Sequence, residues 1–269
     1  YTTLFRSFSS RIVPMARSIR ISLIFMRSCC VKSDIHKHRI PVVPLGNPFP
    51  PRHCSLCPKG AAIDRDNQHR LIDKRRRFKA GEILARQDEA ANMLFVIHEG
   101  YCKSSVECGD NDFISRFYVP GDIMALDAVE GGKYLTTIKA ATAAEVCHID
   151  IARLFKVAEK DPSVAAAVIK FLCRDNGFIV EKLRRYANKH AEARIAAFLV
   201  EFYEMHLRIG RPETTLRLPF SREEIASYLD LKIETVSRSL KSLEHQKLIS
   251  LHRVRTVTIN SYLGLKGFS

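Results

Sequence analysis

Residues between positions 163 and 190 follow a pattern that predicts a helix with a partner. Apolar residues recur there at intervals of three and four, which is the a/d repeat of a coiled coil. Val168, Phe171 and Phe178 add a second apolar stripe, so one face can pack on its own domain while the other meets a second helix. We expect a parallel dimerisation helix over 161–188; an internal core helix, apolar on two sides, is the alternative. The repeat comprises Ile169, Leu172, Asn176, Ile179, Leu183, Tyr186 and His190.

The segment before this helix has the features of a β domain. Short runs of strand-forming residues alternate with glycines, which supply tight turns. Many short strands of this kind are typical of a β-roll or jelly-roll barrel. We expect such a domain over 61–160, opening with a short helix at 63–73. The predicted strands are 75–78, 93–98, 102–107, 113–118, 136–140 and 145–149.

Residues 1–60 form a distinct basic extension. They hold ten Lys or Arg and one acidic residue, Asp34, so they carry +9 of the net charge of +14. Six prolines between positions 41 and 58 exclude a packed helix there. We expect this extension to be disordered or not native, with the true start at Met15 or Met26. Because the segment is rich in Arg and Ser, a transit peptide is the alternative.

Two features of the composition bear on location. No apolar run is long enough to span a bilayer, so we expect no membrane segment. Eight cysteines without a regular spacing favour a reducing compartment over a disulfide framework. We therefore expect a cytoplasmic protein whose 269 residues form two modest domains.

The last domain, expected over 189–269, contains a pair of helices. Ser221 and Glu224 have the spacing of a capping box, in which each side chain accepts a hydrogen bond from the other residue's backbone amide. A tight connection at 230–232 separates the first helix from the second. The apolar residues expected to be buried are Ile225, Ala226 and Leu229 in the first helix and Ile233, Val236, Leu240 and Leu243 in the second.

The opposite face of the second helix carries groups that can contact base edges in a major groove. Arg238 can donate two hydrogen bonds to guanine O6 and N7, and Glu234 can accept one from cytosine N4. These residues lie near the N-terminal end, which a helix-turn-helix inserts into the groove. The predicted reading set is Glu234, Ser237, Arg238 and Lys241.

Two strand-forming runs follow, at 248–251 and 254–259, joined through His252 and Arg253. They predict a two-stranded wing whose cations suit phosphate contacts. With the helix pair and the upstream dimerisation helix, the wing indicates a winged helix-turn-helix that binds double-stranded DNA. A small helical pair with a solvated charged face is the alternative.

Three segments resemble the CRP/FNR superfamily, and specifically its FNR-like branch of oxygen-responsive regulators. They are residues 117–128, 191–198 and 233–238, and the resemblance spans about 54–259. It implies an α+β chain with a cyclic-nucleotide-binding-like β-roll, a long dimerisation helix and a C-terminal winged helix-turn-helix. It also implies a homodimeric transcription regulator that recruits or blocks RNA polymerase and is not an enzyme.

The resemblance assigns roles in DNA recognition. In FNR-type proteins the residues matching Glu234, Ser237 and Arg238 contact the half-site TTGAT, and dimer symmetry implies an inverted repeat of it. Lys232 stands where many relatives have Thr as a helix cap. A phosphate contact by Lys232 is therefore expected in place of the cap.

The resemblance suggests two effectors for the β-roll. A cyclic nucleotide needs an arginine for its phosphate, and residues 122–140 contain none, so we expect no cyclic nucleotide. An oxygen-sensing 4Fe-4S iron-sulfur cluster needs three N-terminal cysteines and one from the roll. Cys54, Cys57 and Cys147 match three of these four positions.

The third N-terminal cysteine of that pattern is absent. At the usual spacings, five or seven intervening residues after Cys57, the chain has Ile63 and Arg65 instead. The candidate substitutes for the missing ligand are Asp64, Asp66, His69 and Cys102. Three alternatives stay open: a cluster with redox or oxygen response, a cluster-free regulator with thiol-based or constitutive control, and zinc or another ligand. His148 is expected to point away from Cys147 and to lie at the surface.

An enzyme is the rival class. A metal cupin needs His-x-His with a carboxylate in the barrel strands, and a thiol oxidoreductase using Cys54 and Cys57 needs a βαβ setting. Neither context is present in the sequence. We therefore expect a binding protein.

Overall fold

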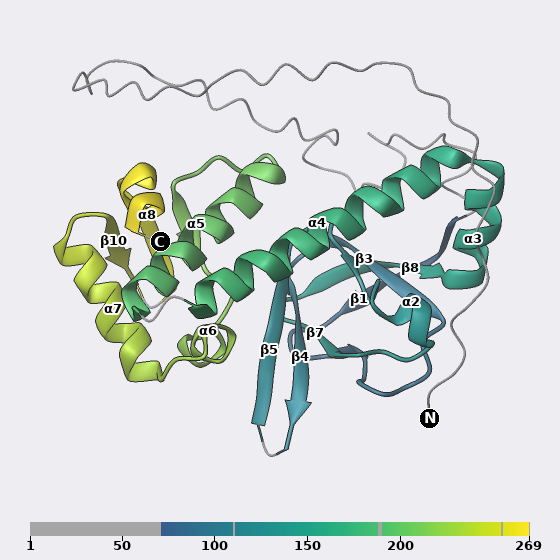
Figure 1. Ribbon diagram of the computed structural model, residues 1–269, viewed down its shortest axis with the longest axis horizontal. Coiled ribbons are helices and arrows are strands. Elements are labelled where there is room, and N and C mark those ends of the chain that lie inside the picture. Colours follow the sequence, from purple (N-terminus) through teal and green to yellow (C-terminus); the bar gives the residue numbers. More distant parts are fainter. Residues whose placement is uncertain (1–70, 110, 188–189, 254, 269) are drawn as a thin grey trace, which may run out of the picture. The chain divides into compact units, whose positions relative to one another are not determined.

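The computed structural model describes residues 71–268 except 110, 188–189 and 254. All of them belong to one unit of the chain, Pro44–Ser269, and Figure 1 colours them in chain order. The predictions for residues 1–60 lie outside the described residues, as does most of the short helix expected at 63–73. Ile72 and Asp73, at the end of that expected helix, belong instead to the first strand.

In the described residues, eight antiparallel strands form a β-roll of two four-stranded sheets. Their orders are β1-β8-β3-β6 and β2-β7-β4-β5. All six predicted strands are present, whereas β2 and β6, of three and two residues, are too short to show an alternating pattern. The strands are β1 (Ile72–Phe78), β2 (Ile83–Ala85), β3 (Met93–Glu99), β4 (Cys102–Cys108), β5 (Asn111–Tyr118), β6 (Ile123–Met124), β7 (Thr137–Ala140) and β8 (Ala144–Asp150).

The turn from β3 to β4 depends on a glycine. Gly100 has a φ of +84°, and a Cβ at this position would lie 2.3 Å from the carbonyl oxygen of Ala143. Only a residue without a side chain fits both the conformation and the space. This turn places Tyr101, the next residue, against α5 (Ala191–Arg208), where its ring lies 6.2 Å from that of Phe202.

His148 is buried, so the prediction that it lies at the surface is wrong. It sits on β8, which pairs with β1 on one side and β3 on the other. Its ring stacks on Phe78 at 6.0 Å and meets Phe95 edge-on at 5.2 Å. Because β8 has neighbours on both sides and both of its faces are covered, Cys147 is also fully buried.

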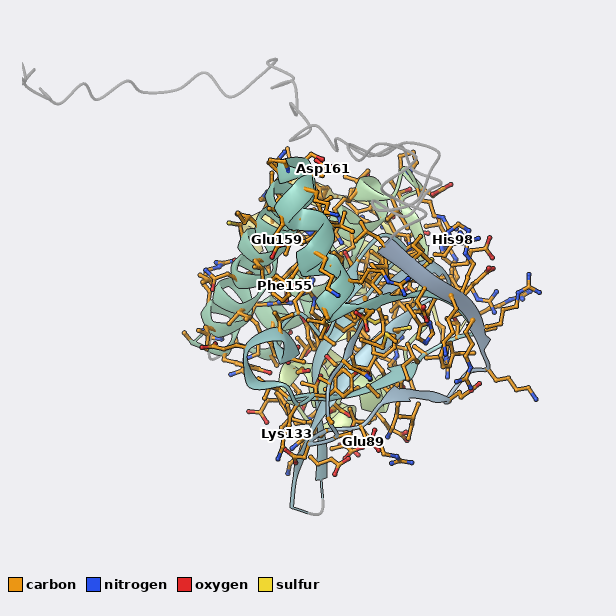
Figure 2. The ribbon with its side chains drawn as sticks, turned by 90° about the vertical axis from the view of Figure 1, so that its right-hand side faces the viewer. Glu89, His98, Lys133, Phe155, Glu159 and Asp161 are labelled. Carbon is orange, nitrogen blue, oxygen red and sulfur yellow. The ribbon has the colours of Figure 1, made fainter. Side chains whose placement is uncertain are left out.

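Three helices follow or interrupt the roll: α2 (Ala128–Gly131), α3 (Ile151–Lys160) and α4 (Pro162–Ala187). The Asp150 side chain caps α3 by accepting a hydrogen bond from the Arg153 amide. Phe155 and Glu159 lie on the outer side of α3, and Asp161 follows where α3 gives way to α4 (Figure 2). None of the described helices is long and apolar enough to cross a membrane.

The long helix α4 has the two apolar faces that the sequence predicts. Val164, Ala167 and Phe171 are buried in the core of the roll, with Val168 packed against it. The heptad series lies on the exposed side, although it ends earlier than predicted. Tyr186 bonds the backbone carbonyl of Tyr228, and His190 lies beyond the helix as the N-cap of α5. The exposed members of the heptad series are Ile169, Leu172, Asn176, Ile179 and Leu183.

The C-terminal domain is a helical layer with a small sheet. Its strands are ordered β10-β11-β9, so the predicted wing hairpin is joined by a third strand, β9, which the sequence did not reveal. The terminal helix α8 was also not predicted. The elements after α5 are β9 (Thr215–Arg217), α6 (Arg222–Leu229), α7 (Ile233–His245), β10 (Ile249–His252), β11 (Thr256–Ile259) and α8 (Tyr262–Phe268).

Burial of His148 predicts a pH dependence of folding. Burial, with nearby Lys74 and Arg76, lowers the pKa of His148 in the folded protein. The unfolded chain then binds more protons, so the free energy of unfolding falls as the pH drops below the usual histidine pKa of about 6.5. We expect His148→Phe to make this slope shallower, by up to about 1.4 kcal/mol per pH unit. Urea unfolding between pH 7 and 5 measures it; an unchanged slope contradicts the prediction.

Candidate nucleic-acid interface

The capping box at the start of α6 is present. The Glu224 amide donates to the Ser221 hydroxyl at 3.1 Å, and the Ser221 amide donates to the Glu224 carboxylate at 2.6 Å. The helix ends at Asp230, whose φ of 53° places it in the left-handed region, and the Leu231 amide bonds the Ala226 carbonyl at 3.0 Å. These bonds define a tight turn between α6 and α7, as the sequence predicts.

The buried face of α7 is nearly as expected. Val236, Leu240 and Leu243 are buried against the rest of the domain, and Ser239 is buried with them. Ile233, predicted to be buried, is 41% exposed. It is the first residue of α7, and the buried residues of the helix begin three positions later, at Val236.

The polar face of α7 is directed to solvent. Glu234, Arg238 and Lys241 are exposed and Ser237 is half-buried. Lys232 is the N-cap of α7 and makes no side-chain capping bond. Among the described residues, no ion pair engages Arg238 or Lys241, so these cations are available to a ligand. One helix face therefore offers donors, an acceptor and positive charge together.

A cavity of about 750 Å³ borders this face. Thr235, Arg238 and Ser242 of α7 line one side, and the start of α5, including Glu192, lines another. The wing lies further along the chain, with Arg253 exposed between β10 and β11. The structure places the predicted reading set on one helix and the wing cation on the hairpin that follows it.

The cysteines of the described residues do not form a metal site by themselves. Cys147 is fully buried on β8, opposite Arg75 and Val96. Cys102 is buried on β4, and burial raises its pKa to about 12. No group of three or more metal-ligating side chains occurs in the described part of the chain.

The donors that an iron-sulfur cluster needs besides Cys147 fall earlier in the chain. Cys54 and Cys57, like the candidate substitutes Asp64, Asp66 and His69, lie outside the described residues. Since a 4Fe-4S cluster takes four protein ligands, the described residues do not fit such a cluster on their own.

Comparisons with known proteins agree with this architecture. Residues 75–161 match the cyclic nucleotide-binding domain, and residues 193–268 match the Crp-like helix-turn-helix domain. Among solved structures, FixK2 from Bradyrhizobium japonicum aligns with a TM-score of 0.67 and 24% identity over 74% of this chain and 98% of its own. A CooA mutant from Carboxydothermus hydrogenoformans aligns with a TM-score of 0.62 and 19% identity, over 77% of this chain and 91% of its own.

Sequence relatives carry regulatory names. The transcriptional regulatory protein btr of Bordetella pertussis is 28% identical over 80% of this chain and 92% of its own length. The transcriptional activator protein anr of Pseudomonas aeruginosa is 28% identical over 74% of this chain and 84% of its own length. The anaerobic regulatory protein of Haemophilus influenzae is 25% identical over 74% of this chain and 78% of its own length.

A β-roll of the cyclic nucleotide-binding type, a long helix and a winged helix-turn-helix define the class of DNA-binding transcription regulators. Within that class, the chain belongs to the CRP/FNR family.

Proposed function

We propose that the chain binds as a homodimer to an inverted repeat of the half-site TTGAT and controls transcription by recruiting or blocking RNA polymerase. The observation that carries this proposal is the solvent-directed face of α7. Glu234, Ser237 and Arg238 occupy its first two turns, with no ion pair to Arg238 in the described residues.

The chemistry of this face suits the proposed half-site. Arg238 can donate two hydrogen bonds to a guanine, and Glu234 can accept one from a cytosine. Lys232, Lys241 and Arg253 supply cations for phosphates, which position the protein on the duplex without reading sequence. The two kinds of contact have different signatures, because base contacts set specificity whereas phosphate contacts set salt dependence.

The exposed seam of α4 supports a dimer. Ile169, Ile179 and Leu183 are 58%, 56% and 62% exposed, which is unusual for large apolar side chains in a row. Their spacing matches a parallel coiled coil, with Asn176 as a polar residue at one core position that can fix the register. A second copy of the same helix, over the proposed 161–188, covers all of them at once.

Replacing the reading arginine tests the DNA assignment. We expect Arg238→Ala to weaken binding to a TTGAT inverted repeat by at least tenfold, because a dimer loses two bidentate pairs and each contributes about 1–3 kcal/mol of discrimination. Gel retardation at fixed salt measures the effect. Arg153→Ala, which removes an exposed cation from α3, is the matched control and leaves binding unchanged. Equal binding by the Arg238→Ala variant and the wild-type protein contradicts the assignment of Arg238 as a base-contacting residue.

A charge in the seam tests the dimer. We expect Ile179→Glu to convert the protein to a monomer, because two carboxylates then face each other across an apolar interface. Sedimentation equilibrium measures the mass. Phe155→Glu places the same charge on an exposed apolar site of α3, 53% exposed and away from the seam, and stays dimeric. A dimeric Ile179→Glu variant contradicts the proposed interface.

The effector proposal follows the relatives named for anaerobic regulation. We propose a redox or oxygen response through a cluster held by Cys54, Cys57, Cys147 and a fourth donor; a cluster-free regulator, with constitutive or thiol-based control, is the alternative. The buried Cys147 suits a ligand shielded from water.

Anaerobic purification separates these two forms of control. The cluster predicts brown protein that contains iron and acid-labile sulfide, bleaches in air and loses its colour in Cys147→Ser. Colourless protein, purified without oxygen and still able to bind the inverted repeat in air, rejects the cluster and leaves the cluster-free regulator.

A further inference from the structure

The carboxylate of Asp122 lies where three elements meet. Asp122 ends the turn between β5 and β6 and is 1% exposed. Its Oδ2 accepts a hydrogen bond from the Val119 amide at 3.0 Å, and its Oδ1 accepts one from Arg208 of α5 at 2.9 Å. Arg174 of α4 lies 3.7 Å from the same Oδ1. One carboxylate therefore links the β-roll, α4 and α5.

The charges around Asp122 keep it ionised. Burial raises the pKa of Asp122, but Arg208, Arg174 and Arg116 together outweigh burial and hold the pKa below its usual value. Arg116 of β5 forms a further ion pair with Asp175 of α4. Two carboxylates and three guanidiniums thus make one network, in which removal of a single partner leaves buried charge uncompensated.

Apolar contacts join the same parts of the chain. Phe117 of β5 stacks on Phe220, which precedes α6, with ring centroids 3.6 Å apart. Ile114 and Val119 of the roll also belong to the core of the C-terminal domain. Such burial holds the two domains together, although the hydrophobic effect that drives it is itself non-directional.

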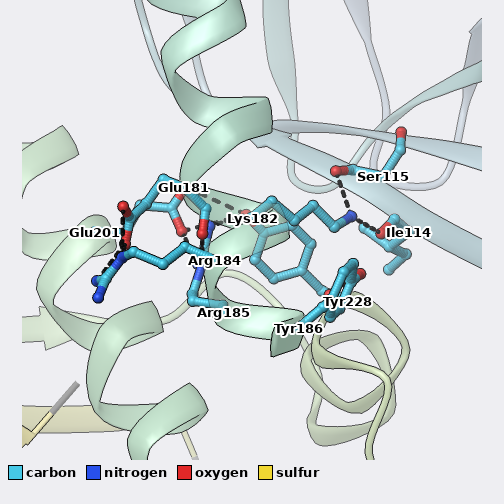
Figure 3. Close-up of polar contacts among 9 residues, drawn as sticks. All are labelled: Ile114, Ser115, Glu181, Lys182, Arg184, Arg185, Tyr186, Glu201 and Tyr228. Carbon is cyan, nitrogen blue, oxygen red and sulfur yellow. Dashed lines mark hydrogen bonds and ion pairs between the residues drawn. The ribbon is translucent and has the colours of Figure 1, made fainter. Parts of the chain in front are cut away.

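The C-terminal end of α4 is held by directional bonds to three elements (Figure 3). Lys182 donates to the carbonyl oxygens of Ile114 and Ser115 on β5, at 3.0 and 2.7 Å. Arg185 pairs with Glu201 of α5 and donates to the Tyr228 hydroxyl of α6 at 3.2 Å. The first helix of the helix-turn-helix is therefore docked, while α7 keeps its polar face in solvent.

We propose that Asp122 is a positioning residue for DNA binding. With Arg174 and Arg208 it fixes the angle between α4, which carries the dimer seam, and α5, which leads into the helix-turn-helix. We call the cluster of Asp122, Arg174 and Arg208 the joint. The separation of the two reading helices in the dimer then depends on the geometry of this joint. The inference rests on the proposed function, since it concerns how two copies present α7 to paired half-sites.

The test compares two duplexes bound by the full-length protein. We expect Asp122→Asn, which keeps the shape and removes the charge, to bind the TTGAT inverted repeat at least tenfold more weakly than wild type. Its affinity for a duplex with a single half-site stays within twofold, because one reading helix does not depend on the separation of two. Glu181→Gln, which removes a carboxylate from an exposed ion pair with Arg184 on α4, is the matched control and changes neither affinity.

Two outcomes of the binding test overturn the inference. One is equal binding of both duplexes by Asp122→Asn and wild type. The other is an equal loss on both duplexes with a lowered melting temperature, which indicates a role in stability alone. If Asp122→Asn does not fold, Arg208→Gln is used, since it removes the same bond from the α5 side and is expected to show the same selective loss.

Hydrogen exchange tests the joint without DNA. The Ile114 amide donates to the Ser227 hydroxyl of α6 at 3.0 Å, so its exchange reports on the contact between roll and helix-turn-helix. We expect faster exchange at Ile114 in Asp122→Asn, with unchanged exchange in the β3–β8 ladder of the roll. Unchanged exchange at Ile114 overturns the inference. If the wild-type protein does not bind the inverted repeat, the proposed function fails. The exchange measurement still tests whether Asp122 holds the roll and the helix-turn-helix together, because it needs no DNA.

Discussion

The structure depends on one helix that is apolar on two sides for two different reasons. On α4, Val164, Ala167 and Phe171 complete the core of the β-roll. The opposite stripe, which includes Ile169 and Leu183, lies in solvent in the single chain. A row of exposed apolar side chains is unfavourable in water unless something covers it, and its heptad spacing suits the proposed second copy of the same helix. The proposed partner surface and the domain core are thereby built on one helix.

Polar contacts extend from α4 to α5 and to α6, the first helix of the helix-turn-helix. Hydrophobic burial around Phe117 and Phe220 holds the roll and the C-terminal domain together. Ion pairs and hydrogen bonds centred on Asp122 and Lys182 supply direction. Arg208 connects the β5–β6 turn of the roll directly to α5. In the proposed regulator, a change in the roll would reach the helix-turn-helix through this contact.

Patterns local in sequence predicted much of this structure. The capping box of Ser221 and Glu224 and the buried stripe from Val236 to Leu243 are fixed by spacing within a few residues, and both are present. The reading set lies on one exposed helix face for the same reason. Elements of two or three residues, such as β6 and β9, contain too few positions for a period to appear.

Features that depend on distant parts of the chain escaped prediction. His148 is buried because β8 has neighbours on both sides, which a strand pattern alone does not specify. Arg208 reaches Asp122 across 86 positions, so no periodicity relates the two residues. The register and the contacts between domains come from tertiary packing.

In the proposed complex, two chains joined along α4 place two α7 helices on one duplex. Native mass spectrometry of the full-length protein with a duplex carrying the TTGAT inverted repeat tests it most directly. We expect a complex of two chains per duplex, which is lost when both half-sites are scrambled. A complex of one chain per duplex, or the same complex on the scrambled duplex, contradicts it.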